Sequence, residues 1–225
     1  MENMEKNISE VQEKVQTRRE FLKSASKVVA GAAVLGTVGS ILGTSTAAIA
    51  EDTASAPAYP FPYQRLDPDE TEKRGYESYY ALGGCGVGVY NAIVGQLAEV
   101  VGYPYNQLPI GMLANASTGY GVGSFCGSLG GAVAAIGLVC EAADAKKITG
   151  ELTSWYRTAE FPHYQPVLKS ITTVADSVNC MDSVGVYMEK TGVKMGSDER
   201  KARCAGVTAD VAKKAVELLN AFFNV

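Results

Sequence analysis

Five cysteines are the residues of this chain with the most distinctive chemistry, and the first of them comes only after about a third of the sequence. They are Cys85, Cys126, Cys140, Cys180 and Cys204. No two are spaced as C-x-x-C, so the chain has neither a thioredoxin motif nor a zinc-knuckle spacing. The absence of C-x-x-C-H likewise argues against a covalently attached c-type haem. The chemistry of these thiols must therefore depend on how the fold brings them together.

Three interpretations of the cysteines remain open from their spacing. Free cysteines can lie in the core as small apolar residues, and Cys140 fits this role because it continues an apolar stripe with Leu129, Val133 and Ile136. Four of the cysteines could instead form two disulfides in an oxidising compartment. Four thiolates could also ligate a metal ion or an iron–sulfur cluster.

Local sequence favours thiolates at two positions. Cys85 and Cys126 each stand beside glycines at the predicted start of a helix, where free N–H groups and the positive end of the helix dipole stabilise an anionic sulfur. Cys180 is expected at another helix start, and Cys204 on the inward face of the C-terminal helix. Cysteines placed in this way could converge at one end of a helical bundle.

The elements that must position these cysteines are predicted to be helices. Apolar residues recur at three- and four-residue steps over 85–101, 125–145, 148–156 and 199–223, and shorter helices are predicted over 69–80 and 165–178. No strand pattern of useful length occurs. We therefore expect an all-α bundle of four to six helices with glycine-rich loops. The glycines of 83–88 do not follow a predicted strand, so they do not indicate a dinucleotide site.

The first 50 residues have the pattern of a twin-arginine export signal. Arg18 and Arg19 precede Phe21, Leu22 and Lys23, an apolar segment without charges covers 28–50, and an A-x-A cleavage pattern closes it. We expect residues 1–50 to be this signal peptide, 51–68 a Pro- and aromatic-rich arm or linker, and 69–225 the cysteine-containing redox domain. An amphipathic N-terminal helix and an uncleaved membrane anchor are the alternatives. Export would place the protein in the periplasm or on the outer face of the cytoplasmic membrane.

The charge of the predicted mature chain is moderately acidic. Residues 51–225 hold fourteen Lys/Arg against nineteen Asp/Glu, a net charge of −5. No basic stripe is present that could neutralise phosphates, so a nucleic-acid partner is not expected.

A resemblance to a known family selects among the cysteines. Cys85, the segment 126–131, the segment 179–182 and Cys204 together resemble the redox-active family named for its C_GCAxxG_C_C pattern. With the pattern around one cysteine taken as C-G-A-x-x-G, this chain differs from it by having Ser128 in place of Ala. The chain also has a fifth cysteine. Residues 84–97 are also similar to the helical domain of the split-Soret cytochromes, and the resemblance covers roughly 76–223.

The resemblance implies a function as well as a ligand set. Split-Soret cytochromes carry a cysteine-ligated two-iron cluster, form dimers and have c-type haem sites that this chain lacks. By resemblance, Cys85, Cys126, Cys180 and Cys204 would ligate an iron–sulfur cluster of the [2Fe–2S] type in an electron-transfer protein that could dimerise. Its partner would be a cytochrome or a membrane oxidoreductase. A thiol–disulfide protein and a disulfide-stapled accessory subunit are the alternatives.

Other candidate residues give little indication of chemistry. His163 is the only histidine, so a histidine-based metal triad is excluded, although this residue could still serve as a single ligand. No nucleophile–base pair can be assembled from the sequence. We therefore expect an electron carrier or accessory subunit rather than an enzyme with its own substrate. The aromatic segment 155–164 is expected to pack in the core.

Overall fold

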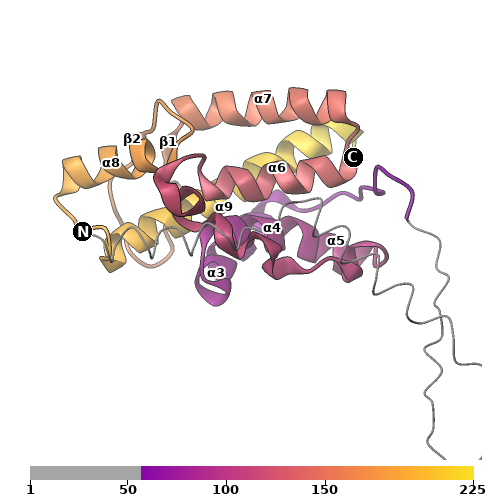
Figure 1. Ribbon diagram of the computed structural model, residues 1–225, viewed down its shortest axis with the longest axis horizontal. Coiled ribbons are helices and arrows are strands. Elements are labelled where there is room, and N and C mark those ends of the chain that lie inside the picture. Colours follow the sequence, from indigo (N-terminus) through magenta and orange to yellow (C-terminus); the bar gives the residue numbers. More distant parts are fainter. Residues whose placement is uncertain (1–56) are drawn as a thin grey trace, which may run out of the picture. The chain divides into compact units, whose positions relative to one another are not determined.

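The structure, a computed structural model, describes residues 57–225, which are mostly helical, with irregular connections and one two-stranded ribbon (Figure 1). The predicted signal peptide and residues 51–56 of the predicted arm lie outside the described residues. The α-helices are α3 (Pro68–Leu82), α4 (Cys85–Tyr90), α5 (Gln96–Val100), α6 (Gly127–Val139), α7 (Ala142–Thr158), α8 (Cys180–Thr191) and α9 (Asp198–Phe223). A π-helical turn, η1 (Asn91–Gly95), joins α4 to α5. Because α4, η1 and α5 follow one another without a gap, the described residues form six helical rods. The predicted all-α class is confirmed.

The long helix α9 packs against two pairs of helices. On one side it contacts α3 and α4, and on the other it contacts α6 and α7, which run beside it in Figure 1. Its buried residues include Val207, Val211, Ala215 and Leu219, which recur at four-residue steps and therefore share one face. None of the helices of the described residues combines the length and apolar composition needed to cross a membrane.

Two of the predicted helices differ from the structure. The segment 125–145 is not one helix, because α6 ends at Val139 and Cys140 adopts an extended conformation before α7 begins. The segment 165–178 is not helical; it holds β2 (Thr173–Val174), which pairs antiparallel with β1 (Glu160–Phe161). The apolar residues that suggested a helix there, such as Val167 and Ile171, are exposed, so no core interaction holds them on a helical face.

The connection between α5 and α6 is irregular, as predicted for 103–124. It holds two 3-10 turns, η2 (Tyr105–Gln107) and η3 (Ile110–Ala116), and the π-type turn η4 (Gly119–Gly123). Thr118 and Tyr120 adopt left-handed backbone conformations, which are uncommon for residues other than glycine.

The proline-rich arm wraps the body of the protein. The Tyr59 hydroxyl donates to the carbonyl oxygens of Gly137 and Cys140, at 3.0 and 2.8 Å. Tyr63 stacks on Phe223, with ring centroids 4.8 Å apart, and its hydroxyl donates to Oδ1 of Asn220 at 2.8 Å. The described part of the arm therefore ties the far end of α6 to the end of α9.

The glycines of α6 have opposite environments along the helix. A Cβ on Gly131 would clash with the carbonyl oxygen of Gly86 and lie 3.1 Å from the Cβ of Val89, whereas a Cβ on Gly137 would meet nothing within 4 Å. Gly131 thus permits the close approach of α4 and α6.

Substitution of Gly131 by alanine is expected to lower the free energy of unfolding by about 1–3 kcal/mol, because the added methyl group overpacks this contact. Gly137→Ala is the matched control on the same helix, and it is expected to raise the free energy of unfolding by about 0.5–1 kcal/mol. Urea unfolding of the two variants measures both values. Equal effects of the two substitutions would contradict the close helix–helix contact.

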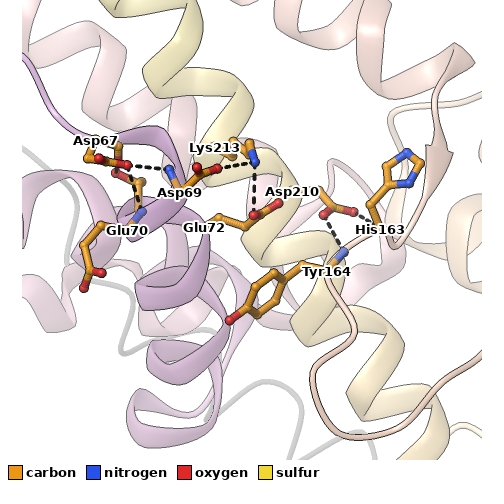
Figure 2. A network of polar contacts seen from close by, with 9 residues as sticks. Asp67, Asp69, Glu70, Glu72, His163, Tyr164, Asp210 and Lys213 are labelled. Carbon is orange, nitrogen blue, oxygen red and sulfur yellow. Dashed lines mark hydrogen bonds and ion pairs between the residues drawn. The ribbon is translucent and has the colours of Figure 1, made fainter.

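A polar network holds α3 and the 162–164 loop against α9 (Figure 2). Lys213 pairs with Asp69 at 2.6 Å and with Glu72 at 3.1 Å. Asp210 is buried, and its carboxylate accepts hydrogen bonds from the backbone N–H groups of His163 and Tyr164, at 2.7 and 3.0 Å. Lys213 therefore holds α3 against α9, and Asp210 holds the 162–164 loop against the same helix.

Replacement of Asp210 by alanine is expected to destabilise the protein by about 2 kcal/mol, because two backbone donors lose their acceptor.

Burial also raises the pKa of the Asp210 carboxyl above its ordinary value, although the two N–H groups oppose this shift. The folded state then binds this proton more tightly than the unfolded chain. The resulting stabilisation is present below the unfolded pKa and is lost as the pH rises through the folded pKa. Unfolding free energies measured between pH 3 and 7 should show a flatter profile in Asp210→Asn, and an unchanged profile would contradict this assignment.

Candidate metal centre

The structure brings four of the five cysteines to one place. Cys85 begins α4, Cys126 directly precedes α6, Cys180 begins α8, and Cys204 lies in the second turn of α9. All four line a single small cavity of about 20 Å³. Cys140 is buried in the apolar core at the opposite end of α6 and lines neither this cavity nor the larger one beside it. Its expected role as a small core residue is therefore confirmed.

A short antiparallel bridge fixes two of these cysteines relative to each other. Phe125 and Asn179 form an isolated β-bridge. The N–H of Cys126 donates to the carbonyl oxygen of Val178 at 2.8 Å, and the N–H of Cys180 donates to that of Ser124 at 2.7 Å. Cys126 and Cys180, 54 positions apart in the numbering of the chain, therefore enter their helices from adjacent extended segments.

Gly127 allows the third cysteine to approach. A Cβ on Gly127 would lie 2.6 Å from Sγ of Cys85 and would clash with the carbonyl oxygen of Ala116. The sulfur of Cys85 also accepts a hydrogen bond from the backbone N–H of Gly86, which lowers its pKa. The glycines beside the cysteines thus supply close packing and a backbone donor, as the sequence led us to expect.

Burial has the larger effect on the thiol pKa values. The pKa of Cys85 is raised by burial and further by Cys126, Cys204 and Cys180 nearby. Burial also raises the pKa of Cys180 to about 12, with Arg203 and Arg200 opposing the shift. The expectation that a helix start stabilises a thiolate at Cys85 is therefore wrong for the protein without a bound cation. Desolvation and neighbouring sulfurs outweigh the helix dipole, so thiolates here need additional positive charge.

A buried arginine supplies part of that charge. Arg203 is 2% exposed and lines the four-cysteine cavity. Its Nη2 donates to the carbonyl oxygen and to Oγ of Ser183, at 3.1 and 2.7 Å, and its Nε has no hydrogen-bond partner. The guanidinium lies over the rings of Phe161 and Tyr187, 5.2 and 5.8 Å from their centroids. Among residues 57–225 no carboxylate pairs with it.

An uncompensated guanidinium in a protein interior is costly, because arginine remains protonated at all accessible pH values. The side chain thus indicates that an anionic group belongs in the adjacent cavity.

A hydrogen-bonded pair connects this arginine to Cys126. The Tyr156 hydroxyl is fully buried and lies 3.1 Å from Oγ of Ser183. The same hydroxyl is hydrogen-bonded to the sulfur of Cys126. Because the Tyr156 hydroxyl donates its proton to Ser183, it lies beside Cys126 without a second proton to donate to that sulfur.

A second, larger cavity opens onto the cysteines. It has a volume of about 330 Å³ and shares Cys85, Cys180, Cys204 and Val184 with the small one. Arg200 lines it, with Nη1 3.7 Å from Sγ of Cys204. The small cavity alone has room for about one water molecule, so a group held by all four sulfurs must extend into the larger one.

The donor set suits an iron–sulfur cluster better than a single ion. No three His, Cys, Asp or Glu side chains of the described region are placed to hold one metal ion. In a two-iron cluster the four protein ligands are divided between the irons, so convergence of three sulfurs on one point is not required. All five cysteines are free. Four sulfur donors and a buried cation without a carboxylate partner fit an anionic cluster.

The remaining candidate residues lie away from this centre. His163 is exposed and lines neither cavity at the cysteines. The aromatic segment 155–164 contributes Tyr156 and Phe161 to the core, as expected. Sequence reasoning missed Arg203 and Ser183. Arg203 carried a usable signal, since it stands four residues before Val207 on the apolar stripe of α9, where a charge is unusual.

Comparison with known proteins shows the family of this chain. Residues 90–218 match the family model described as "Putative redox-active protein (C_GCAxxG_C_C)". The split-Soret cytochrome c of Desulfovibrio desulfuricans is 32% identical over 216 residues, which cover 90% of this chain and 77% of that protein.

A solved structure has the same fold. The structure titled "A novel iron centre in the split-Soret cytochrome c from Desulfovibrio desulfuricans ATCC 27774" superposes with a TM-score of 0.71 at 33% identity. The alignment covers 73% of this chain and 72% of that one.

The family pattern also corrects one detail of the motif. The family name places the cysteine in G-C-A-x-x-G, so Cys126 and Gly130 match, whereas Phe125 and Gly127 replace Gly and Ala. The departure therefore lies at Phe125 and Gly127 and not at Ser128. An alanine at 127, as in the family pattern, would place its Cβ 2.6 Å from Sγ of Cys85. With the family model covering more than half of the sequence, the chain belongs to the C_GCAxxG_C_C family.

Proposed function

We propose that this protein is an exported electron-transfer protein that holds a [2Fe–2S] cluster through Cys85, Cys126, Cys180 and Cys204. The observation that carries the proposal is the cavity lined by these four cysteines and by the unpaired Arg203. The relative whose title names an iron centre supports iron as the metal. The twin-arginine pattern at Arg18 and Arg19 supports export in the folded state.

The residues around the cavity would each perform a defined task. The four thiols bind as thiolates, and Arg203 offsets part of their negative charge. The backbone N–H of Gly86 donates to Cys85, and Tyr156 holds Ser183, which accepts from Arg203. Burial of the cavity limits the access of water. When bound, the cluster supplies one-electron chemistry, and no substrate is turned over. A cytochrome or membrane oxidoreductase is the proposed electron partner, and the protein could act as a homodimer.

A redox titration of the anaerobically purified protein tests this function against its thiol–disulfide alternative. One-electron behaviour, with about 59 mV per tenfold change in the ratio of oxidised to reduced protein, is expected for the cluster. A disulfide couple would give about 30 mV per tenfold change, together with a loss of free thiols on oxidation. Two-electron behaviour, or no transition at all, would contradict the proposal.

A further inference from the structure

The larger cavity extends well past the cysteines. From Cys85, Cys180 and Cys204 it continues between the aromatic side chains of α3, including Tyr79 and Tyr80, and the loop residue Met195. Its volume of about 330 Å³ falls within the range of about 300–1,000 Å³ that is typical of small-molecule sites. The ligand set of the redox centre uses only one wall of this space.

The charged side chains that line this cavity are of one sign. Arg200 and Lys201 line it, and no aspartate or glutamate does. Arg200 is held in place, because its Nε donates to the carbonyl oxygen of Met195 at 2.6 Å and its Nη1 contacts Sγ of Cys204 at 3.7 Å. Two adjacent cations in a partly enclosed apolar space favour a negatively charged occupant.

The opposite wall supplies a hydroxyl-bearing loop with strained backbone. Ser117 and Thr118 both line the cavity. Thr118 has a φ of 56°, a conformation that is costly for a β-branched residue and that persists where the surrounding structure imposes it. The hydroxyl of Ser117 lies 3.4 Å from the carbonyl oxygen of Gly83, a long contact. Ser117 can donate to a ligand only in place of this contact with Gly83, and Thr118 lines the same cavity.

We propose that this cavity binds a small anion, an inorganic oxyanion or a short carboxylate, next to the redox centre. Arg200 and Lys201 supply the charge, and Ser117 and Thr118 supply hydroxyl donors. Arg200 contacts Cys204 directly, so an anion bound to this guanidinium lies adjacent to one sulfur of the centre.

Calorimetric titration of the full chain with nitrite, sulfate and acetate, each separately, tests this site. We expect at least one probe to bind, and the pattern among the three distinguishes inorganic oxyanions from carboxylates. Lys201→Gln is expected to weaken binding about threefold to fivefold, since a partly exposed charge contributes modestly. Arg200→Gln is expected to weaken it tenfold or more, because its guanidinium is held in place by Met195 and Cys204 and can bind bidentately.

Lys147→Gln is the matched control. Lys147 pairs with Asp144 at 2.9 Å in the same i,i+3 arrangement as Lys201 with Asp198 at 3.1 Å, and it does not line the cavity. The control should bind the probe as the wild type does. Failure of all three probes to bind, or equal weakening by Lys147→Gln and Lys201→Gln, would overturn the proposal.

Iron analysis of the same samples keeps this proposal separate from the proposed function. Iron-free protein that still binds the probe through Lys201 would support the anion site and contradict the cluster. Iron-loaded protein that binds none of the three probes would contradict the anion site alone.

Discussion

Substitution of Cys126 by serine is expected to reduce retained iron by more than tenfold, while the helical fold persists. Cys126 is 7% exposed and lines the four-cysteine cavity. Serine has nearly the same size, but its hydroxyl is a poor replacement for a thiolate toward iron. Loss of a hydrogen bond outside the ligand set already costs about 10–100-fold in metal affinity or activity, so loss of a ligand should cost at least as much. Iron content per chain and circular dichroism of the purified variant measure the two effects.

Cys140→Ser is the matched control for this substitution. Cys140 is also buried, at 2% exposure, and flanks the opposite end of the same helix, α6. It should keep the iron content of the wild type, although burial of a hydroxyl group will cost some stability. Equal iron in the two variants would show that Cys126 is not a ligand.

Replacement of Arg203 by methionine is expected to act in opposite directions on the iron-free and the iron-loaded protein. Without the metal, the substitution removes a buried charge with no carboxylate partner, so stability should be unchanged or higher by about 1–2 kcal/mol. With the metal, the same substitution removes positive charge beside an anionic centre. The reduction potential should then fall by on the order of 50–100 mV, for an effective dielectric constant of about 20, and iron should be lost more readily.

Arg203→Lys separates charge from shape in this experiment. Lysine keeps the positive charge but cannot reproduce the stacking on Phe161 and the paired contacts to Ser183. The reduction potential of Arg203→Lys should therefore stay closer to the wild-type value than the reduction potential of Arg203→Met does. A loss of stability in Arg203→Met without any change in potential would assign the arginine a purely structural role.

The helical class was predictable because each long helix has a clear apolar period and a recognisable end. The stripe of Val207, Val211 and Ala215 predicted α9 almost to its bounds, and Gly102–Pro104 marked the end of α5. The break at Cys140 was not predictable in this way. Cys140 itself continues the apolar pattern of α6, and the arm that contacts its carbonyl oxygen through Tyr59 comes from about 80 residues earlier in the chain.

The candidate site was predictable only in part for a related reason. Helix starts at Cys85, Cys126 and Cys180 follow from local sequence, and the family pattern separates these residues from Cys140. The convergence of the sulfurs depends on the Phe125–Asn179 bridge, and the state of the thiols depends on burial. Such long-range contacts leave no periodic signal. For that reason the helix dipole suggested a thiolate at Cys85 where desolvation raises the pKa.

The twin-arginine segment and the cysteine cavity support each other in this proposal. A cluster assembled before export requires a route for folded proteins, whereas disulfides formed after export do not. Anaerobic purification of the full chain, followed by absorption spectroscopy with iron and acid-labile sulfide counts, tests the central claim most directly. We predict two irons and two sulfides per chain and visible absorption that is bleached by dithionite. A colourless, iron-free protein with all five thiols titratable would contradict it.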